Sequence, residues 1–80
     1  MRERPSALQP EPLESLGLTR REAEVLAWVG EGKTNAVIGS ILGTSSRTVG
    51  KHLEHVYQKL GVETRTAAAR LAFTAPTEAS

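Results

Sequence analysis

Apolar residues recur at helical spacing in four stretches of the 80-residue chain. In the clearest stretch, 46–60, apolar side chains follow one another by four, three and four positions, which places them on one helical face. The stretch 35–42 contains Val and Ile, which also favour strands, but its apolar spacing and closing glycine favour a helix. The pattern predicts an all-α domain with four helices, at about 20–30, 35–42, 46–60 and 65–73. The expected core consists of Val25, Leu26, Val29, Ile38, Leu42, Val49, Leu53, Val56 and Leu60.

The connection between the second and third predicted helices is only three residues long, Gly43-Thr44-Ser45. A short turn with a glycine between two helices is typical of a helix-turn-helix, here at about 35–54. Thr19 and Glu22 form the pattern of a capping box before the first helix. The other expected N-caps are Thr34 or Asn35, Ser45, and Glu63 or Thr64.

The two ends of the chain lack this periodicity. Residues 1–17 carry three prolines and are expected to form a flexible linker or arm, and 74–80 are expected to be a disordered tail. The domain itself is expected at 18–73. The absence of cysteine excludes disulfides and thiolate metal sites, and no long apolar run or signal peptide is present. We therefore expect a cytoplasmic protein, consistent with one domain of a longer chain.

The formal net charge of +1 conceals an uneven distribution. Within 18–73, eight Lys and Arg residues face five Glu residues, a net charge of +3, whereas the flanks carry −2. A mildly basic domain permits an anionic partner without requiring one.

The predicted helix 46–60 has a polar face opposite its apolar stripe. The outward positions are Arg47, Gly50, Lys51, Glu54, His55 and Gln58. Every one of these except the glycine can hydrogen-bond to a base edge or a phosphate. Such a face can also be merely solvated, but the preceding turn would let the N-terminal half of the helix enter a major groove.

These features also match the pattern of a known family over the whole predicted domain. The matching residues are Leu18, Thr19, Arg21, Glu22, Val25, Leu26, Gly32, Thr34, Asn35, Ile38, Ser45, Thr48, Val49, His52, Lys59, Leu60, Gly61, Val62 and Arg65. The segment resembles the LuxR/NarL/FixJ-type DNA-binding domain of bacterial transcription regulators. The resemblance implies a four-helix bundle that binds specific sequences of double-stranded DNA, with 46–60 as the recognition helix. It also implies a homodimer, often through the last helix, and an upstream receiver or ligand-sensing domain.

The expected site residues fall into three groups. Those facing the bases are Arg47, Gly50, Lys51, Glu54 and His55. Those facing phosphates are Lys33, Thr34, Asn35, Ser46, Thr48 and Lys59, several of them at helix N-termini whose free amides can hold an anion. The expected dimer surface on the last helix comprises Ala67, Arg70 and Leu71.

The chain departs from the family pattern at a few positions. Ala36 and Val37 stand where relatives often have Lys and Glu. The lysine would supply a charge that faces a phosphate, and the glutamate would supply the second half of a capping box; this chain has neither. Gly39 replaces a common alanine and is expected to loosen its helix. Gly50 stands where many relatives carry a lysine that reads the groove, so that base contact cannot be carried over. Either Gly50 permits close approach to DNA, or a contact has been lost.

Other functions fit the sequence less well. His52 and His55 share a helix face, but a metal site lacks a third ligand, and we expect no metal or cofactor. Trp28 could stack on a base, although partial burial beside apolar neighbours is the simpler expectation. No catalytic constellation is present, so an enzyme is not expected. Two alternatives stay open: a protein-interaction or dimerisation module with little DNA affinity, and a domain like region 4 of sigma factors.

Overall fold

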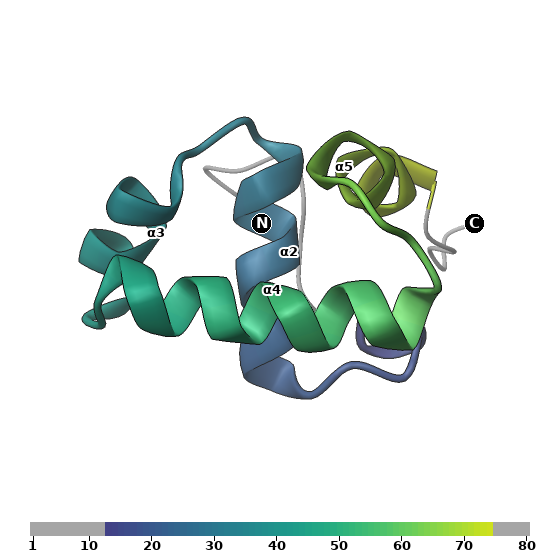
Figure 1. The fold of residues 1–80 in the computed structure, drawn as a ribbon, viewed down its shortest axis with the longest axis horizontal. Helices are drawn as coiled ribbons and strands as arrows, with labels where there is room; N and C mark the ends of the chain where they lie inside the picture. The colour runs from purple at the N-terminus through teal and green to yellow at the C-terminus, as the bar shows by residue number, and fades with distance from the viewer. Residues whose placement is uncertain (1–12, 75–80) are drawn as a thin grey trace, which may run out of the picture.

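The computed structural model describes residues 13–74, and within that range it is helical with no strand. Figure 1 shows the helices α2 (Arg20–Gly30), α3 (Asn35–Leu42), α4 (Ser46–Leu60) and α5 (Arg65–Thr74). The predicted all-α fold is therefore confirmed, and the last helix runs one residue beyond its predicted end. Among the described residues, no helix is both long enough and apolar enough to cross a lipid bilayer.

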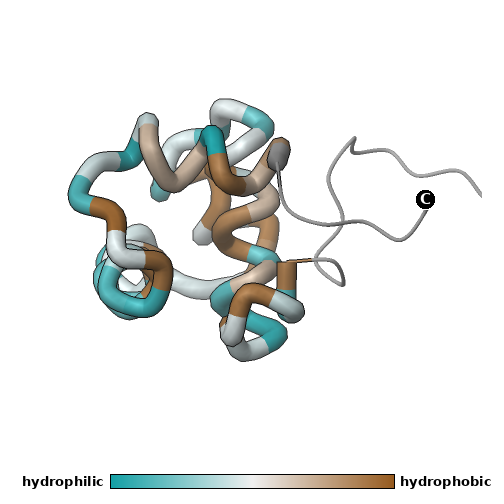
Figure 2. The backbone as a smooth tube through the Cα atoms, turned by 90° about the vertical axis from the view of Figure 1, so that its right-hand side faces the viewer, coloured by the Kyte–Doolittle hydropathy of each residue, from teal (hydrophilic) through white to brown (hydrophobic). Residues whose placement is uncertain are grey.

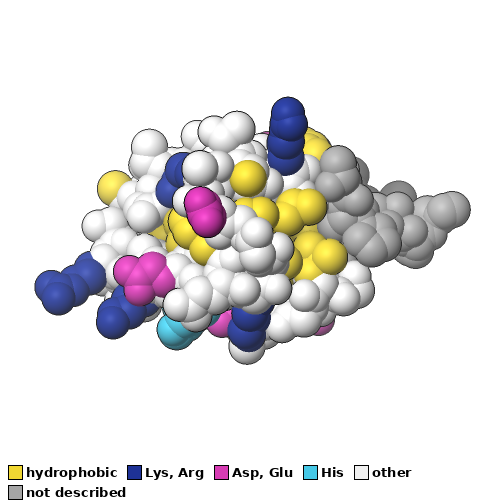
Figure 3. Space-filling model, turned by 45° about the vertical axis from the view of Figure 1, so that its right-hand side comes forward, with side chains coloured by type: hydrophobic (Ala, Val, Ile, Leu, Met, Phe, Trp, Pro, Cys, Tyr) yellow, Lys and Arg dark blue, Asp and Glu magenta, His cyan; other side chains and the backbone are white. Residues whose placement is uncertain are grey.

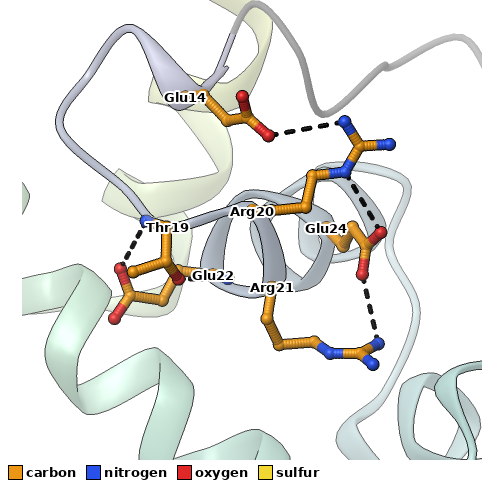
Figure 4. Close-up of polar contacts among 6 residues, drawn as sticks. All are labelled: Glu14, Thr19, Arg20, Arg21, Glu22 and Glu24. Atoms are coloured by element: carbon orange, nitrogen blue, oxygen red, sulfur yellow. Dashed lines mark hydrogen bonds and ion pairs between the residues drawn. The ribbon is translucent and has the colours of Figure 1, made fainter.

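Helix α2 begins with the predicted capping box. The Thr19 hydroxyl accepts a hydrogen bond from the Glu22 amide (3.1 Å), and the Glu22 carboxylate accepts one from the Thr19 amide (3.0 Å), as Figure 4 shows in part. On the solvent side, the Arg20 guanidinium lies 3.4 Å from Glu14 and 3.3 Å from Glu24. These exposed ion pairs add little stability. The capping box, by contrast, directs the Glu22 side chain back along the helix start.

The turn between α3 and α4 is closed by two local motifs. Gly43 adopts a left-handed conformation (φ 74°), and the Thr44 amide donates to the Gly39 carbonyl at 2.8 Å, which completes a Schellman-type end to α3. Ser45 then caps α4, because its hydroxyl accepts from the Thr48 amide at 3.1 Å. The short turn thus stops one helix and starts the next, as the sequence predicts.

Gly39 has a role in this turn that differs from the expected loosening of the helix. It is buried, and a Cβ atom at this position would lie 2.6 Å from the Thr44 carbonyl oxygen and 3.1–3.2 Å from backbone atoms of Ser45 and Ser46. A methyl group could fit only if the backbone of the turn moved. The glycine therefore allows α3 to pack tightly against the chain that leads into α4.

Helix α4 lies across the molecule, with α3 against one end and α5 beside the other, while α2 crosses behind it (Figure 1). Helix α2 packs against α4 and α5, and α3 packs chiefly against α4. Hydrophobic and hydrophilic residues alternate along the helices in Figure 2, because each helix has one face toward the interior. The largest fully buried side chains are Leu13, Leu26, Ile38, Val25, Val49 and Val56.

The expected core is largely confirmed. Seven of its nine residues are buried, whereas Leu42 and Leu60 are half-buried against the others. Alanines on the inner faces of α2 and α5 complete the core together with residues before α2. The added members are Leu13, Leu18, Ala23, Ala27, Ala68 and Ala72.

The expected linker at 1–17 ends earlier than the sequence suggested. Leu13 is only 1% exposed and Leu16 packs against the core, so the packed domain includes residues that precede Leu18. Backbone hydrogen bonds from Leu16 to Leu13 and from Gly17 to Glu14, both 3.0 Å, fold this segment into a turn under the bundle. The rest of the expected arm, 1–12, and the tail from 75 onward lie outside the described residues.

Candidate nucleic-acid interface

One face of α4 carries exposed polar side chains. Arg47, Lys51 and Glu54 are exposed, as predicted, and their side chains make no hydrogen bond or ion pair with other residues of 13–74. The opposite face holds Val49 and Leu53 in the core. Figure 3 shows basic side chains that project from the surface next to acidic and histidine side chains. The α4 face therefore offers donors and an acceptor that the fold itself does not use.

Gly50 differs from its neighbours on this face. It is half-buried, and the one heavy atom that an added Cβ would meet within 4 Å is Asn35 Nδ2, at 3.8 Å. That distance is an ordinary van der Waals contact, so the protein itself leaves room for a methyl group. The position lies beside the first residue of α3, at the junction of the two helices rather than at the most exposed edge of α4.

The start of α4 carries short hydroxyl side chains. Ser46 and Thr48 are both exposed, as expected for residues facing a phosphate. The Ser45 hydroxyl donates to the Thr48 hydroxyl at 3.1 Å, which leaves the Thr48 proton available to another acceptor. Hydroxyls and free amides therefore gather at this helix N-terminus.

The segment that leads into α3 is held from two sides. The Lys33 amide donates to the Trp28 carbonyl at the end of α2 (3.1 Å), and the Lys33 carbonyl accepts from Arg65 Nη2 (2.7 Å). Thr34 caps α3 through the Val37 amide at 3.2 Å. The Lys33 side chain is exposed and makes no hydrogen bond or ion pair within the described part of the chain.

Asn35, expected to face a phosphate, has a fixed orientation. Its Oδ1 atom accepts a hydrogen bond from Arg65 Nη1 at 2.8 Å. Because a guanidinium can only donate, this contact assigns the oxygen to the side of Arg65 and the NH₂ group to the other side. That other side is the one that faces Gly50.

Lys59 and His55 lie close to a carboxylate of α2, an arrangement that the sequence pattern did not predict. The ammonium of Lys59 lies 2.8 Å from Glu22 Oε1, and His55 Nδ1 lies 3.8 Å from Glu22 Oε2. The Glu22 side chain is only 6% exposed, whereas those of Lys59 and His55 are 39% and 58% exposed. The structure therefore gives Lys59 an ion pair that holds α4 to α2, and the expected contact of Lys59 with a phosphate stays a prediction.

The environment of Glu22 favours its charged form. Burial of the carboxyl group would raise its pKa, but hydrogen bonds from the Lys59 ammonium and the Thr19 backbone outweigh that effect. The pKa of Glu22 is therefore held below its ordinary value, and the carboxylate stays charged at neutral pH. A buried carboxylate of this kind anchors two helices only while its cation remains in place.

Helix α5 presents the expected dimer residues in different environments. Arg70 is exposed, but Ala67 and Leu71 are half-buried, so the leucine is less open than the sequence suggested. Ala68 and Ala72 form the inner face of the helix. Phe73, at the end of α5, is 61% exposed and was not among the expected surface residues.

The alternative sites gain no support from the described residues. Between 13 and 74, no group of three or more His, Cys, Asp or Glu side chains is placed to hold a metal ion. Trp28 is half-buried and packs against the core, which confirms the simpler expectation for it.

The chain matches a family model and several curated proteins. The model for "Bacterial regulatory proteins, luxR family" matches residues 16–72. "Transcriptional activator protein BjaR1" of Bradyrhizobium diazoefficiens is 45% identical over 65 residues, covering 81% of this chain and 27% of the relative. "Transcriptional activator protein AnoR" of Acinetobacter nosocomialis is 49% identical over 55 residues, covering 69% of this chain and 23% of the relative. "Probable transcriptional regulatory protein SgaR" of Hyphomicrobium methylovorum is 47% identical over 64 residues, covering 80% of this chain and 29% of the relative.

The matched region is thus a minor part of each of these relatives, between 23% and 29% of their length. No solved structure matches the chain with comparable significance.

Proposed function

Because the chain belongs to the LuxR family of bacterial regulatory proteins, we propose that it binds specific double-stranded DNA, as the effector domain of a transcription regulator. The observation that supports this proposal best is the α4 face, where Arg47, Lys51 and Glu54 have no partner within 13–74. A helix with such a face, preceded by a three-residue turn, suits insertion into a major groove.

The chemistry of this face suggests which base edges it would read. Arg47 and Lys51 can donate to the two acceptors of guanine, and Glu54 can accept from the amino group of cytosine. His55 borders the same face, although its ring also lies near Glu22. Arg47 lies in the first turn of α4 and Lys51 in the second, so they would contact different base pairs.

Phosphate contacts are proposed at the two helix starts. Lys33 and Thr34 precede α3, and Ser46 and Thr48 lie in the first turn of α4. Both places combine free backbone amides with exposed donors, which favours an anion. Asn35 adds an amide NH₂ group beside Gly50. These contacts would position the recognition helix without carrying sequence information themselves.

The remaining partners are proposed from the relatives and from α5. The three relatives described above are roughly four times as long as the matched segment, and two of these three are named transcriptional activators. We therefore propose that a sensor or receiver domain accompanies this domain in the regulator, which would act in the bacterial cytoplasm. Ala67, Arg70 and Leu71 on α5 are the proposed dimer surface.

The proposal is tested by selecting from a random-sequence duplex library at a stated salt concentration. Binding of the recovered duplex and a scrambled one is then measured by fluorescence anisotropy between about 50 and 200 mM salt. We expect a preference for the recovered duplex of at least about a hundredfold, with affinity that falls as salt rises. Equal affinity for both duplexes would overturn sequence-specific binding, and no binding at low salt would favour the protein-interaction alternative.

A further inference from the structure

Arg65 is placed where its charge is locally unfavourable. It is the first residue of α5, whose N-terminus carries the positive end of the helix dipole. The cap of this helix is supplied by Thr64, whose hydroxyl accepts from the Ala67 amide at 3.0 Å, so Arg65 is not needed for capping. A cation at this position is mildly destabilising unless groups elsewhere in the fold pair with it.

Those groups lie at the start of α3. The two terminal nitrogens of the Arg65 guanidinium donate to different residues: Nη1 to Asn35 Oδ1 at 2.8 Å and Nη2 to the Lys33 carbonyl at 2.7 Å. Both are short, charge-assisted hydrogen bonds. They join residues that lie 30 and 32 positions apart in the sequence. Since α3 packs chiefly on α4, this fork is a direct polar link between α5 and the entry to α3.

The fork fixes the groups that are proposed to meet the DNA backbone. It holds the Lys33 carbonyl, while the Trp28 carbonyl holds the Lys33 amide, so the peptide units on both sides of this residue are fixed and its exposed side chain extends from a rigid support. It also takes the oxygen of Asn35, so that the NH₂ group faces the space beside Gly50. An Asn35 side chain without this contact would be free to turn its oxygen, an acceptor that a phosphate repels, to the same side.

We propose that Arg65 is a positioning residue for DNA binding: it does not touch DNA itself but holds Lys33 and Asn35 in the orientation that contacts one backbone phosphate. This inference rests on the proposed function. A lysine could keep the charge, but its single nitrogen does not reproduce the planar fork that reaches two acceptors at once.

The test compares how much each DNA phosphate contributes to the binding affinity of the parent chain and of the Arg65→Met variant. The probe is the duplex recovered by selection, in which one phosphate at a time is replaced by an uncharged methylphosphonate. In the parent chain, we expect one replacement near the end of the half-site to weaken binding by about tenfold. In Arg65→Met, the same replacement should weaken binding by no more than about twofold, because that contact is already lost.

A matched control separates positioning from simple loss of charge. Arg21→Met removes the same charge from α2, where the guanidinium pairs with Glu24 at 3.1 Å and no DNA contact is proposed. This variant should keep the tenfold effect at the same phosphate. If Arg65→Met does not fold, as judged by circular dichroism, Arg65→Lys is measured instead against the same criterion.

The outcomes are distinct. A parent chain that does not prefer the recovered duplex over the scrambled one overturns the proposed function, and the Arg65 inference with it. A parent chain that prefers the recovered duplex but is sensitive to no phosphate overturns the Arg65 inference alone. A parent chain with a sensitive phosphate, together with an Arg65 variant that keeps that sensitivity or weakens binding equally at every phosphate, overturns the Arg65 inference alone.

Discussion

The two halves of α4 have opposite relations to the rest of the domain. In the N-terminal half, Arg47 and Lys51 extend into solvent and make no polar contact within residues 13–74. In the C-terminal half, Lys59 is tied to the buried carboxylate of Glu22, and Gly61 ends the helix in a left-handed conformation. The fold thus anchors one end of the helix and leaves the other end available, which is how a rigid scaffold presents a binding surface.

The largest expected effect comes from removing the anchor. Glu22→Ala deletes the return bond of the capping box and leaves Lys59 without its carboxylate. We expect the free energy of unfolding, measured in urea, to fall by about 3 kcal/mol. Glu22→Gln is the control, because it keeps an acceptor for the Thr19 amide and should lose less. A loss below about 1 kcal/mol for Glu22→Ala would mean that the anchor does not hold α4.

Acid should weaken the same anchor. Since the pKa of Glu22 in the folded protein lies below its ordinary value, the unfolded chain binds this proton more readily. The stabilisation is complete above the ordinary carboxyl pKa and is lost as the pH falls below about 4.5 toward the folded value. Urea unfolding at a series of pH values should show this decline in the parent chain and a shallower one in Glu22→Gln. Equal slopes would contradict it.

The two lysines of α4 should differ in the same way as the two halves of the helix: one should affect DNA binding and the other stability. We expect Lys51→Ala to weaken binding to the recovered duplex by about 1–3 kcal/mol and to relax the preference at one base pair, with little change in stability. Lys59→Ala should instead lower the free energy of unfolding by about 2 kcal/mol, because it leaves the Glu22 carboxylate, whose side chain is only 6% exposed, without its cation. Fluorescence anisotropy measures the DNA affinity of both variants, and urea unfolding measures their stability. A loss of stability in Lys51→Ala and of DNA affinity alone in Lys59→Ala would contradict the difference between the two halves of α4.

A substitution at Gly39 tests whether the backbone of the turn before α4 can move to accept a larger side chain. Gly39→Ala gains helix propensity, but its methyl group would lie 2.6 Å from a backbone oxygen that must move. We expect a net loss of stability of about 1–2 kcal/mol by thermal or urea unfolding. A variant more stable than the parent chain would show that the turn adapts at little cost.

The smallest expected effect is at Gly50, within the free half itself. Gly50→Ala should raise the free energy of unfolding by about 0.5–1 kcal/mol, because the helix gains propensity and the methyl group meets only Asn35 at 3.8 Å. If Gly50 serves close approach to DNA, the same variant should bind the recovered duplex more weakly. Undiminished binding would refute close approach and indicate a contact that this chain has lost.

The helices and their turn could be predicted from the sequence because their signals are local. Caps, closing glycines and apolar stripes act within one or two turns of helix, and Thr19, Gly43 and Ser45 adopt the expected roles. The outward positions of α4, except the half-buried Gly50, followed from its apolar stripe in the same way. Local pattern could not reveal that a glycine such as Gly39 is required by a neighbouring backbone.

The contacts between helices could not be predicted in this way. Glu22 and Lys59 lie 37 positions apart, and Arg65 and Asn35 lie 30 apart, so no helical period relates them. One signal was present, because Glu22 precedes Val25, Leu26 and Val29 by three, four and seven positions and so lies on their buried face. A carboxylate there requires a cation from another helix, but the sequence does not say which one.

The buried Leu13 has a consequence for chimeric regulators, in which a domain of this kind is joined to a foreign sensor. Its side chain is buried in the core, although Leu13 precedes residue 16, where the match to the family model begins. A junction placed at Leu18 would replace this leucine with an unrelated residue and open the core of a domain too small to spare it. Junctions placed before Leu13 keep this leucine in the core.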